Sequence, residues 1–423
     1  MNILQRARDF LASLDAQREV FLGVAPDRLL QDARSAAARQ AAGKLLGPLD
    51  GQFLAVKANI DVQALRSHAG SLAIDPQPAD NDAPIVARLR SAGAIILGHV
   101  NMSEFAFSGL GVNPHFGTPL NALDSTMVPG GSSSGSASAV ALGLADIALG
   151  TDTSGSVRIP AACQGLVGFR PTMDRYESAG ILPLAPSLDT PGSLALNVSQ
   201  ICAVDRVLSD CKETGHACRQ ILCLREDALA GFTPEIKAMY EQVLQHLSGH
   251  GIELERVDIR SFTRVTEIFQ TYGTLVSAEA FRLLPSLVGD QQARLDPNVQ
   301  DRLAQAASIL GTDLQALLEI RRALIPDFSR ELAGKMLLYP TLPSYPPSVQ
   351  AVTRDKGVFA RENALILSVS MKAAFLNAPT ISIPFGQRRP GSSLSLSGGA
   401  NRDADVLATA SHLEKIFSAI RDG

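Results

Sequence analysis

Two loops rich in glycine and serine are the stretches of this sequence best suited to chemistry. The first covers residues 130–135 (GGSSSG) and the second covers residues 150–156 (GTDTSGS). Glycines let the backbone turn so that N–H groups converge on one point, and serines add hydroxyls there. A helix predicted over 136–144 and a strand predicted over 146–149 join the two loops. Either loop alone would indicate only turns and helix caps, but the pair indicates a site for an oxyanion.

Three blocks of sequence carry a resemblance to a known family. They are residues 55–61 (AVKANID), residues 130–137 (GGSSSGSA) and residues 150–160 (GTDTSGSVRIP). The chain resembles the amidase signature family, whose members hydrolyse amides with a Ser-Ser-Lys triad. The resemblance is strong over about residues 45–200 and weak beyond them.

This resemblance implies a role for each residue of a triad. Ser156 is implied as the nucleophile, Ser132 as the bridging serine after a cis peptide bond, and Lys57 as the base. Lys57 ends an apolar strand predicted over 53–57, where a lysine would otherwise be taken for a solvated terminus. A lysine with its reference pKa of about 10.4 is protonated at neutral pH, so burial must lower that pKa to about 7.

The N–H groups of the second loop are expected to form the oxyanion hole, which the resemblance places at Thr153, Ser154, Gly155 and Ser156. Gly155 allows a turn that a side chain would obstruct.

Three further residues are expected to support the triad. Asp152 and Arg158 flank the second loop and are predicted to form a charge-assisted pair that holds it. The alternative is an exposed ion pair of little consequence. Ser133 is predicted to support Ser132.

The substrate side of the site is less defined by the sequence. Arg66 and Gly131 are the predicted substrate-binding residues, with Arg66 and the divergent segment 387–402 as sources of charge. The segment 176–191, rich in proline and glycine, is expected to wall the site. A small or medium carboxamide, including one that carries a carboxylate, is expected in preference to a lipid amide, because no amphipathic or aromatic membrane-docking stretch is present.

Three other functions compete with an independent amidase. An amidotransferase A-type subunit, which passes ammonia to a partner, shares the triad. The motif G-x-S-x-G with Ser133 at its centre formally fits an α/β-hydrolase esterase, although this needs a preceding strand and a catalytic histidine. A catalytically inactive binding protein is disfavoured because all three triad residues are present.

Composition excludes several classes of partner. The chain has 423 residues, 46% of them hydrophobic, and a net charge of −4, which gives no reason to expect binding to nucleic acid or a membrane. The first residues lack the apolar core of a signal peptide, so a cytoplasmic location is expected. The cysteines, among them Cys211, Cys218 and Cys223, fit no zinc template, and neither a metal nor a cofactor is expected.

Strands that alternate with helices predict an α/β fold. We expect one domain over 1–423, in which a large, twisted, mixed sheet is covered by helices on both faces, as the resemblance also implies. The signature-bearing core covers about 45–200, and an almost wholly helical region covers about 262–336. A helix is predicted to begin at 101–107, and the last strands are predicted at 337–340 and 380–384. A homodimer or a small partner subunit stays open.

Overall fold

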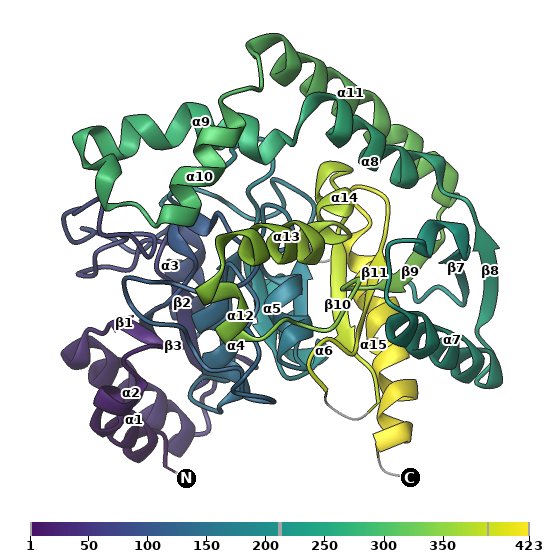
Figure 1. The fold of residues 1–423 in the computed structure, drawn as a ribbon. Helices are drawn as coiled ribbons and strands as arrows, with labels where there is room; N and C mark the ends of the chain where they lie inside the picture. The colour runs from purple at the N-terminus through teal and green to yellow at the C-terminus, as the bar shows by residue number, and fades with distance from the viewer. Residues whose placement is uncertain (1, 210–213, 387–388, 422–423) are drawn as a thin grey trace.

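The centre of the protein is an 11-stranded mixed sheet, seen here in a computed structural model that describes residues 2–209, 214–386 and 389–421 (Figure 1). The strands lie in the order β1-β3-β2-β4-β6-β5-β10-β11-β9-β7-β8. Their bounds are β1 Phe21–Gly23, β2 Phe53–Lys57, β3 Ile95–Val100, β4 Ile147–Thr151, β5 Val167–Arg170, β6 Pro191–Ala195, β7 Gln220–Leu224, β8 Glu253–Val257, β9 Met336–Pro340, β10 Thr380–Pro384 and β11 Ser393–Ser397.

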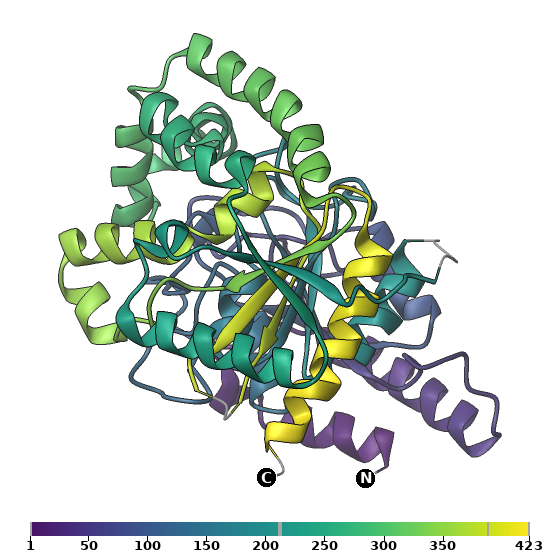
Figure 2. The ribbon, with the colours of Figure 1, turned by 90° about the vertical axis from the view of Figure 1, so that its right-hand side faces the viewer.

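Helices cover this sheet on both faces (Figure 2). Their bounds are α1 Ile3–Ala12, α2 Pro26–Ala41, α3 Pro84–Ser91, α4 Ser134–Ala141, α5 Arg158–Cys163, α6 Val198–Leu208, α7 Pro234–Gly249, α8 Arg260–Tyr272, α9 Leu275–Val288, α10 Pro297–Ala306, α11 Gly311–Leu332, α12 Val349–Arg354, α13 Lys356–Leu367, α14 Ser370–Phe375 and α15 Asp403–Arg421. None of the described helices is long and apolar enough to cross a bilayer.

The alternation of side chains along β2 shows how the two layers form. Phe53 and Ala55 pack in one buried cluster with residues of α1, α2 and α4, whereas Leu54 and Val56 pack in another with residues of α3 and α6. Lys57 lies two positions after Ala55, so its side chain points to the same face of the sheet as Phe53 and Ala55. It extends toward α4 and the loop that precedes α4.

The signature strands meet at the parallel part of the sheet. β2 pairs in parallel with β3 on one side and with β4 on the other, and β4 then pairs antiparallel with β6. Lys57 at the end of β2 and Thr151 at the end of β4 therefore lie at the same edge of the sheet, where the second glycine-serine loop begins.

The helix-rich region predicted over 262–336 is present as α8, α9, α10 and α11. In Figure 1 these helices arch over the upper side of the molecule, and both figures show them on the side opposite the two termini. Asp296 accepts a hydrogen bond from the backbone N–H of Asn298 and so caps the start of α10.

One local prediction is wrong. The helix expected from residue 101 is only a short 3₁₀ turn, Glu104–Ala106, in which Phe105 has a φ of +49°. The last part of the sheet also contains β11, which the sequence did not predict; it lies between β9 and β10 and is buried on both faces.

Candidate active site

Lys57 is fully buried, and three oxygen atoms surround its amine. Nζ donates to Ser132 Oγ at 2.7 Å, to Thr151 Oγ1 at 2.8 Å and to the Thr151 carbonyl at 3.3 Å. A neutral amine has two N–H bonds and one lone pair. The two oxygens of Thr151 can accept the N–H groups, which leaves the lone pair for the hydroxyl proton of Ser132.

Burial lowers the pKa of Lys57 from 10.5 to about 7, because the interior does not solvate the charged form. The negative charges of Asp152 and Asp189 oppose this shift. A lysine with this pKa exchanges a proton at neutral pH, which is the property that a catalytic base needs.

The first glycine-serine loop presents Ser132 to this lysine. The Gly131–Ser132 peptide bond is cis, and the Ser132 carbonyl accepts the Ser103 N–H at 3.0 Å. Gly131 has no room for a side chain, because a Cβ there would lie 2.6 Å from the backbone nitrogen of Gly111. Behind the loop, a Cβ on Gly135 would lie 2.4 Å from the nitrogen of Asn101, so α4 packs directly on that backbone.

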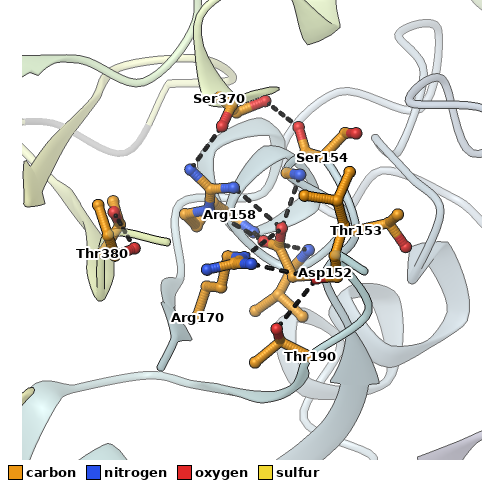
Figure 3. A network of polar contacts seen from close by, with 12 residues as sticks. Asp152, Thr153, Ser154, Arg158, Arg170, Thr190, Ser370 and Thr380 are labelled. Carbon is orange, nitrogen blue, oxygen red and sulfur yellow. Dashed lines mark hydrogen bonds and ion pairs between the residues drawn. The ribbon is translucent and has the colours of Figure 1, made fainter. Parts of the chain in front are cut away.

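Asp152 holds the second loop from inside (Figure 3). Its carboxylate accepts the N–H groups of Gly155 at 2.7 Å and Val157 at 3.2 Å, and Nε and Nη2 of Arg158, both at 2.9 Å. Arg170 Nε lies 3.6 Å from the same carboxylate. Asp152 and both arginines are fully buried, so the predicted pair is present and the alternative of an exposed pair is wrong.

The charges of Asp152, Arg158 and Arg170 shift one another's pKa values. Burial alone would raise the pKa of Asp152, but the charge and hydrogen bonds of Arg158, with the charge of Arg170, lower it. Burial lowers the pKa of Arg170 to about 9, although Asp152 opposes the shift. Arg158 is fully buried, paired with Asp152 and bonded to the Ser370 carbonyl, so it is not available for a substrate carboxylate.

Three of the N–H groups predicted for the oxyanion hole are not used by other described residues. Within the described chain, the backbone nitrogens of Thr153, Ser154 and Ser156 have no hydrogen-bond acceptor. The prediction for Gly155 needs correction, because its N–H donates to Asp152 and fixes the turn.

Ser370 is a residue beside the second loop that the sequence did not reveal. Its hydroxyl, at the start of α14, donates to the Ser154 carbonyl at 2.6 Å (Figure 3). It is far from the signature motifs in sequence, and a serine at a helix start indicates only a cap. Thr151 was missed as well, because a threonine within the second glycine-serine loop indicates only a turn.

The two glycine-serine loops touch beside a cavity. Ser133 N–H donates to the Ser156 carbonyl at 3.2 Å, and the cavity of about 530 Å³ is lined by Ser156 together with Thr153 and Ser154. Residues of α10 and α13 also line it. Leu184 also lines the cavity, which supports the prediction that the 176–191 segment walls the site.

The predicted substrate-binding residues are not brought to this cavity. Arg66 is half-exposed and donates to Asp75 and to the Pro76 carbonyl, both at 2.8 Å. Gly131 is packed in the backbone of the first loop. In the divergent segment, 387 and 388 lie outside the described residues and 393–397 form the buried strand β11. Neither Arg66 nor Gly131 is among the residues that line the cavity.

The geometry does not fit the esterase alternative. Ser133 precedes α4, but no described strand leads into the motif, and its hydroxyl reaches only the Thr151 carbonyl at 3.5 Å. No histidine of the described chain lines the cavity. Ser133 therefore lies beside the triad, where it shares a carbonyl with Lys57.

Among the described residues, no group of three or more His, Cys, Asp or Glu side chains is placed to hold a metal ion. Cys211 lies outside the described residues.

Comparison with known proteins identifies the family. The family model described as Amidase matches residues 3–407. The chain belongs to the amidase family, which confirms the resemblance found in its three signature blocks.

Two relatives and one solved structure show the extent of the similarity. The chain is 36% identical over 303 residues to the A-type subunit of the glutamyl-tRNA(Gln) amidotransferase from Thermobifida fusca, an alignment covering 68% of this chain but only 59% of that protein. It is 35% identical over 335 residues to the 2-amino-5-chloromuconic acid deaminase of Comamonas testosteroni, covering 74% and 71% of the two chains. A crystal structure of an amidase superposes with a TM-score of 0.87 at 27% identity, covering 99% of this chain and 96% of that one. The predicted fold class is thereby confirmed.

Proposed function

We propose that this protein hydrolyses carboxamides through an acyl-enzyme on Ser156, with Ser132 as the relay and Lys57 as the base. The observation that carries the proposal is the 2.7 Å contact between Lys57 Nζ and Ser132 Oγ, in a buried setting that lowers the lysine pKa to about 7. Ser156 lines the adjacent cavity.

We infer the following steps. Neutral Lys57 takes the hydroxyl proton of Ser132, which takes that of Ser156 as the Ser156 oxygen attacks the amide carbon. The N–H groups of Thr153, Ser154 and Ser156 receive the developing oxyanion. The proton returns through Ser132 to the amide nitrogen, the C–N bond breaks, and ammonia or an amine leaves. Water then cleaves the acyl ester by the reverse proton path and releases the carboxylic acid.

Ammonia release by the purified chain tests this function. Wild-type protein should release ammonia from primary amides, and Ser156→Ala should abolish the release while leaving the circular dichroism spectrum unchanged. Ser308→Ala, at an exposed position just after the end of α10, should behave as wild type. Ammonia release by Ser156→Ala at the wild-type rate would contradict the assignment.

A second candidate is supported by the similarity to the Thermobifida fusca amidotransferase protein. In that function the same triad would deliver ammonia to a partner protein. The discriminating measurement is whether the chain alone turns over simple amides, as the first proposal requires. The cytoplasmic location and a homodimer or partner subunit stay predictions.

A further inference from the structure

The cavity beside Ser156 contains one cation that has no anionic partner among the described residues. Three charged residues line the cavity, namely Asp301, Arg302 and Lys356. Lys356 Nζ lies 2.8 Å from Asp301 Oδ2, so these two charges cancel. Arg302 makes no ion pair with any residue in the part of the chain that the structure describes, which leaves the cavity with a net positive charge.

Arg302 is held in a fixed position. Its guanidinium carbon lies 3.8 Å above the centre of the Phe107 ring, and one of its nitrogens donates to the Phe107 carbonyl. The start of α10 is fixed as well, because the backbone N–H of Asp296 donates to Glu104 at 2.6 Å. Since Phe107 also lines the cavity, the arginine is anchored to the core of the enzyme although it belongs to the overlying helices.

This fixed guanidinium has unused donors. A guanidinium carries five N–H groups, and the Phe107 carbonyl is the acceptor that Arg302 contacts in the described chain. Burial lowers its pKa to about 10, so it remains protonated at neutral pH. A partly desolvated cation without a counter-ion is unfavourable, and a bidentate carboxylate relieves this cost.

The other arginines of the region differ in this respect. Arg158 and Arg170 are buried, but both face Asp152. Arg66 is paired with Asp75 on the surface. Arg302 therefore stands apart from these three as a cation that is open toward the cavity.

We propose that Arg302 receives a carboxylate of the substrate, and that the substrate class is the half-amide of a dicarboxylic acid. This inference rests on the proposed amide hydrolysis and specifies its substrate. The carboxylate would lie at the end of the cavity formed by α10, with the amide at Ser156. Apolar side chains such as Phe107, Val276 and Leu367 line the same cavity and suit a methylene spacer.

Steady-state kinetics with paired substrates tests the role of Arg302. Succinamate and glutaramate are compared with 4-oxopentanamide and 5-oxohexanamide, in which a methyl ketone replaces the carboxylate. Wild type should prefer the half-amides. Arg302→Met, which keeps an unbranched apolar side chain, should lower kcat/KM for the half-amides by about 10- to 100-fold, mainly through KM, with less than about threefold change for the ketones. Arg302→Lys should recover part of the loss.

Arg66→Met is the matched control, because it removes an arginine that lies outside the cavity and is paired with Asp75 on the surface. It should change KM for the half-amides by less than about threefold. Equal effects of Arg302→Met and Arg66→Met, or equal effects of Arg302→Met on half-amides and ketones, would overturn the inference and leave amide hydrolysis intact.

Calorimetric titration of Ser156→Ala separates binding from turnover. Ser156→Ala should bind succinamate or glutaramate, and Ser156→Ala/Arg302→Met should lose that binding. If this holds while wild type releases no ammonia from any substrate, the carboxylate site stands and the proposed hydrolysis fails. If Ser156→Ala binds neither half-amide, or if the double variant binds them equally well, the carboxylate site is overturned.

Discussion

Ser370 Oγ occupies the place where a side chain at Gly155 would begin, since a Cβ built on that glycine falls 2.1 Å from it. The same hydroxyl donates to the Ser154 carbonyl at 2.6 Å. Gly155 has a φ of +128°, which side chains other than hydrogen rarely tolerate. A helix from the last part of the chain thus fixes the loop that carries Ser156.

Gly155→Ala should therefore displace this loop. We expect kcat to fall by about 100-fold or more and the Tm to drop, because a shift of about 1 Å at the nucleophile is enough for such a loss. Gly231→Ala is the control, since a Cβ there meets no atom within 4 Å. A Gly155→Ala enzyme with wild-type kcat and Tm would disprove the close contact with Ser370.

Thr151→Val should disturb the base without changing the shape of the strand. The variant loses the hydroxyl that accepts from Lys57 at 2.8 Å, so the protonated lysine is less stabilised and its pKa falls further. The acidic limb of the pH profile of kcat/KM should move to lower pH, and kcat should fall about 10-fold because the amine is less well oriented. Thr353→Val, at an exposed position of α12, should leave the pH profile of kcat/KM unchanged. An unaltered profile in Thr151→Val would exclude this role.

The depressed pKa of Lys57 also predicts how stability depends on pH. Between about pH 7 and 10, the folded protein holds Lys57 neutral, whereas the unfolded chain holds it protonated. The unfolded state then binds one more proton, so raising the pH stabilises the wild type relative to Lys57→Met, by about 1.4 kcal/mol per pH unit at most. Guanidinium unfolding at pH 7, 8 and 9 measures this trend. A free-energy difference between the two proteins that does not change with pH would contradict it.

Asp152→Asn should unfold the site by removing the shared counter-charge. The substitution keeps the size of the side chain but leaves Arg158 and Arg170 buried without an anion. We expect the free energy of unfolding to fall by about 3–5 kcal/mol, with loss of activity. Asp75→Asn, which breaks the exposed pair with Arg66, should have almost no effect on stability. Similar small effects of both substitutions would show that Asp152 is not required.

Local sequence patterns predicted the parts of the fold that lie beside the site. The apolar run that ends in Lys57 and the two loops with their connecting helix and strand lie as expected. They carry their own turn residues and apolar patterning, so their structure does not depend on distant segments.

β11 shows where such prediction fails. Its sequence, SLSLS, alternates as a strand should, but its serine face is buried as well. The serines bond to one another and to neighbouring strands, for example Ser382 to Ser393 at 2.7 Å and Thr380 to Ser397 at 2.7 Å. These partners are known only once the sheet is assembled, so the segment gave no indication of a central strand.

The substrate side was hard to predict for a related reason. Arg66 lies close in sequence to Lys57, whereas Arg302 comes from a helix in another part of the chain. Which cation is left without a carboxylate partner is decided only when the chain folds. Arg66 is then paired with Asp75, and Lys356 with Asp301.

The most direct test of the account is the pH dependence of covalent labelling by a fluorophosphonate, followed by mass spectrometry of the modified peptide. We expect the label on Ser156 and a labelling rate that rises with pH through about 7, as Lys57 loses its proton. In Lys57→Ala the rate should fall by several orders of magnitude and this rise should disappear. A label on Ser133, or a Lys57→Ala protein that is labelled as fast as wild type with the same pH profile, would contradict the account.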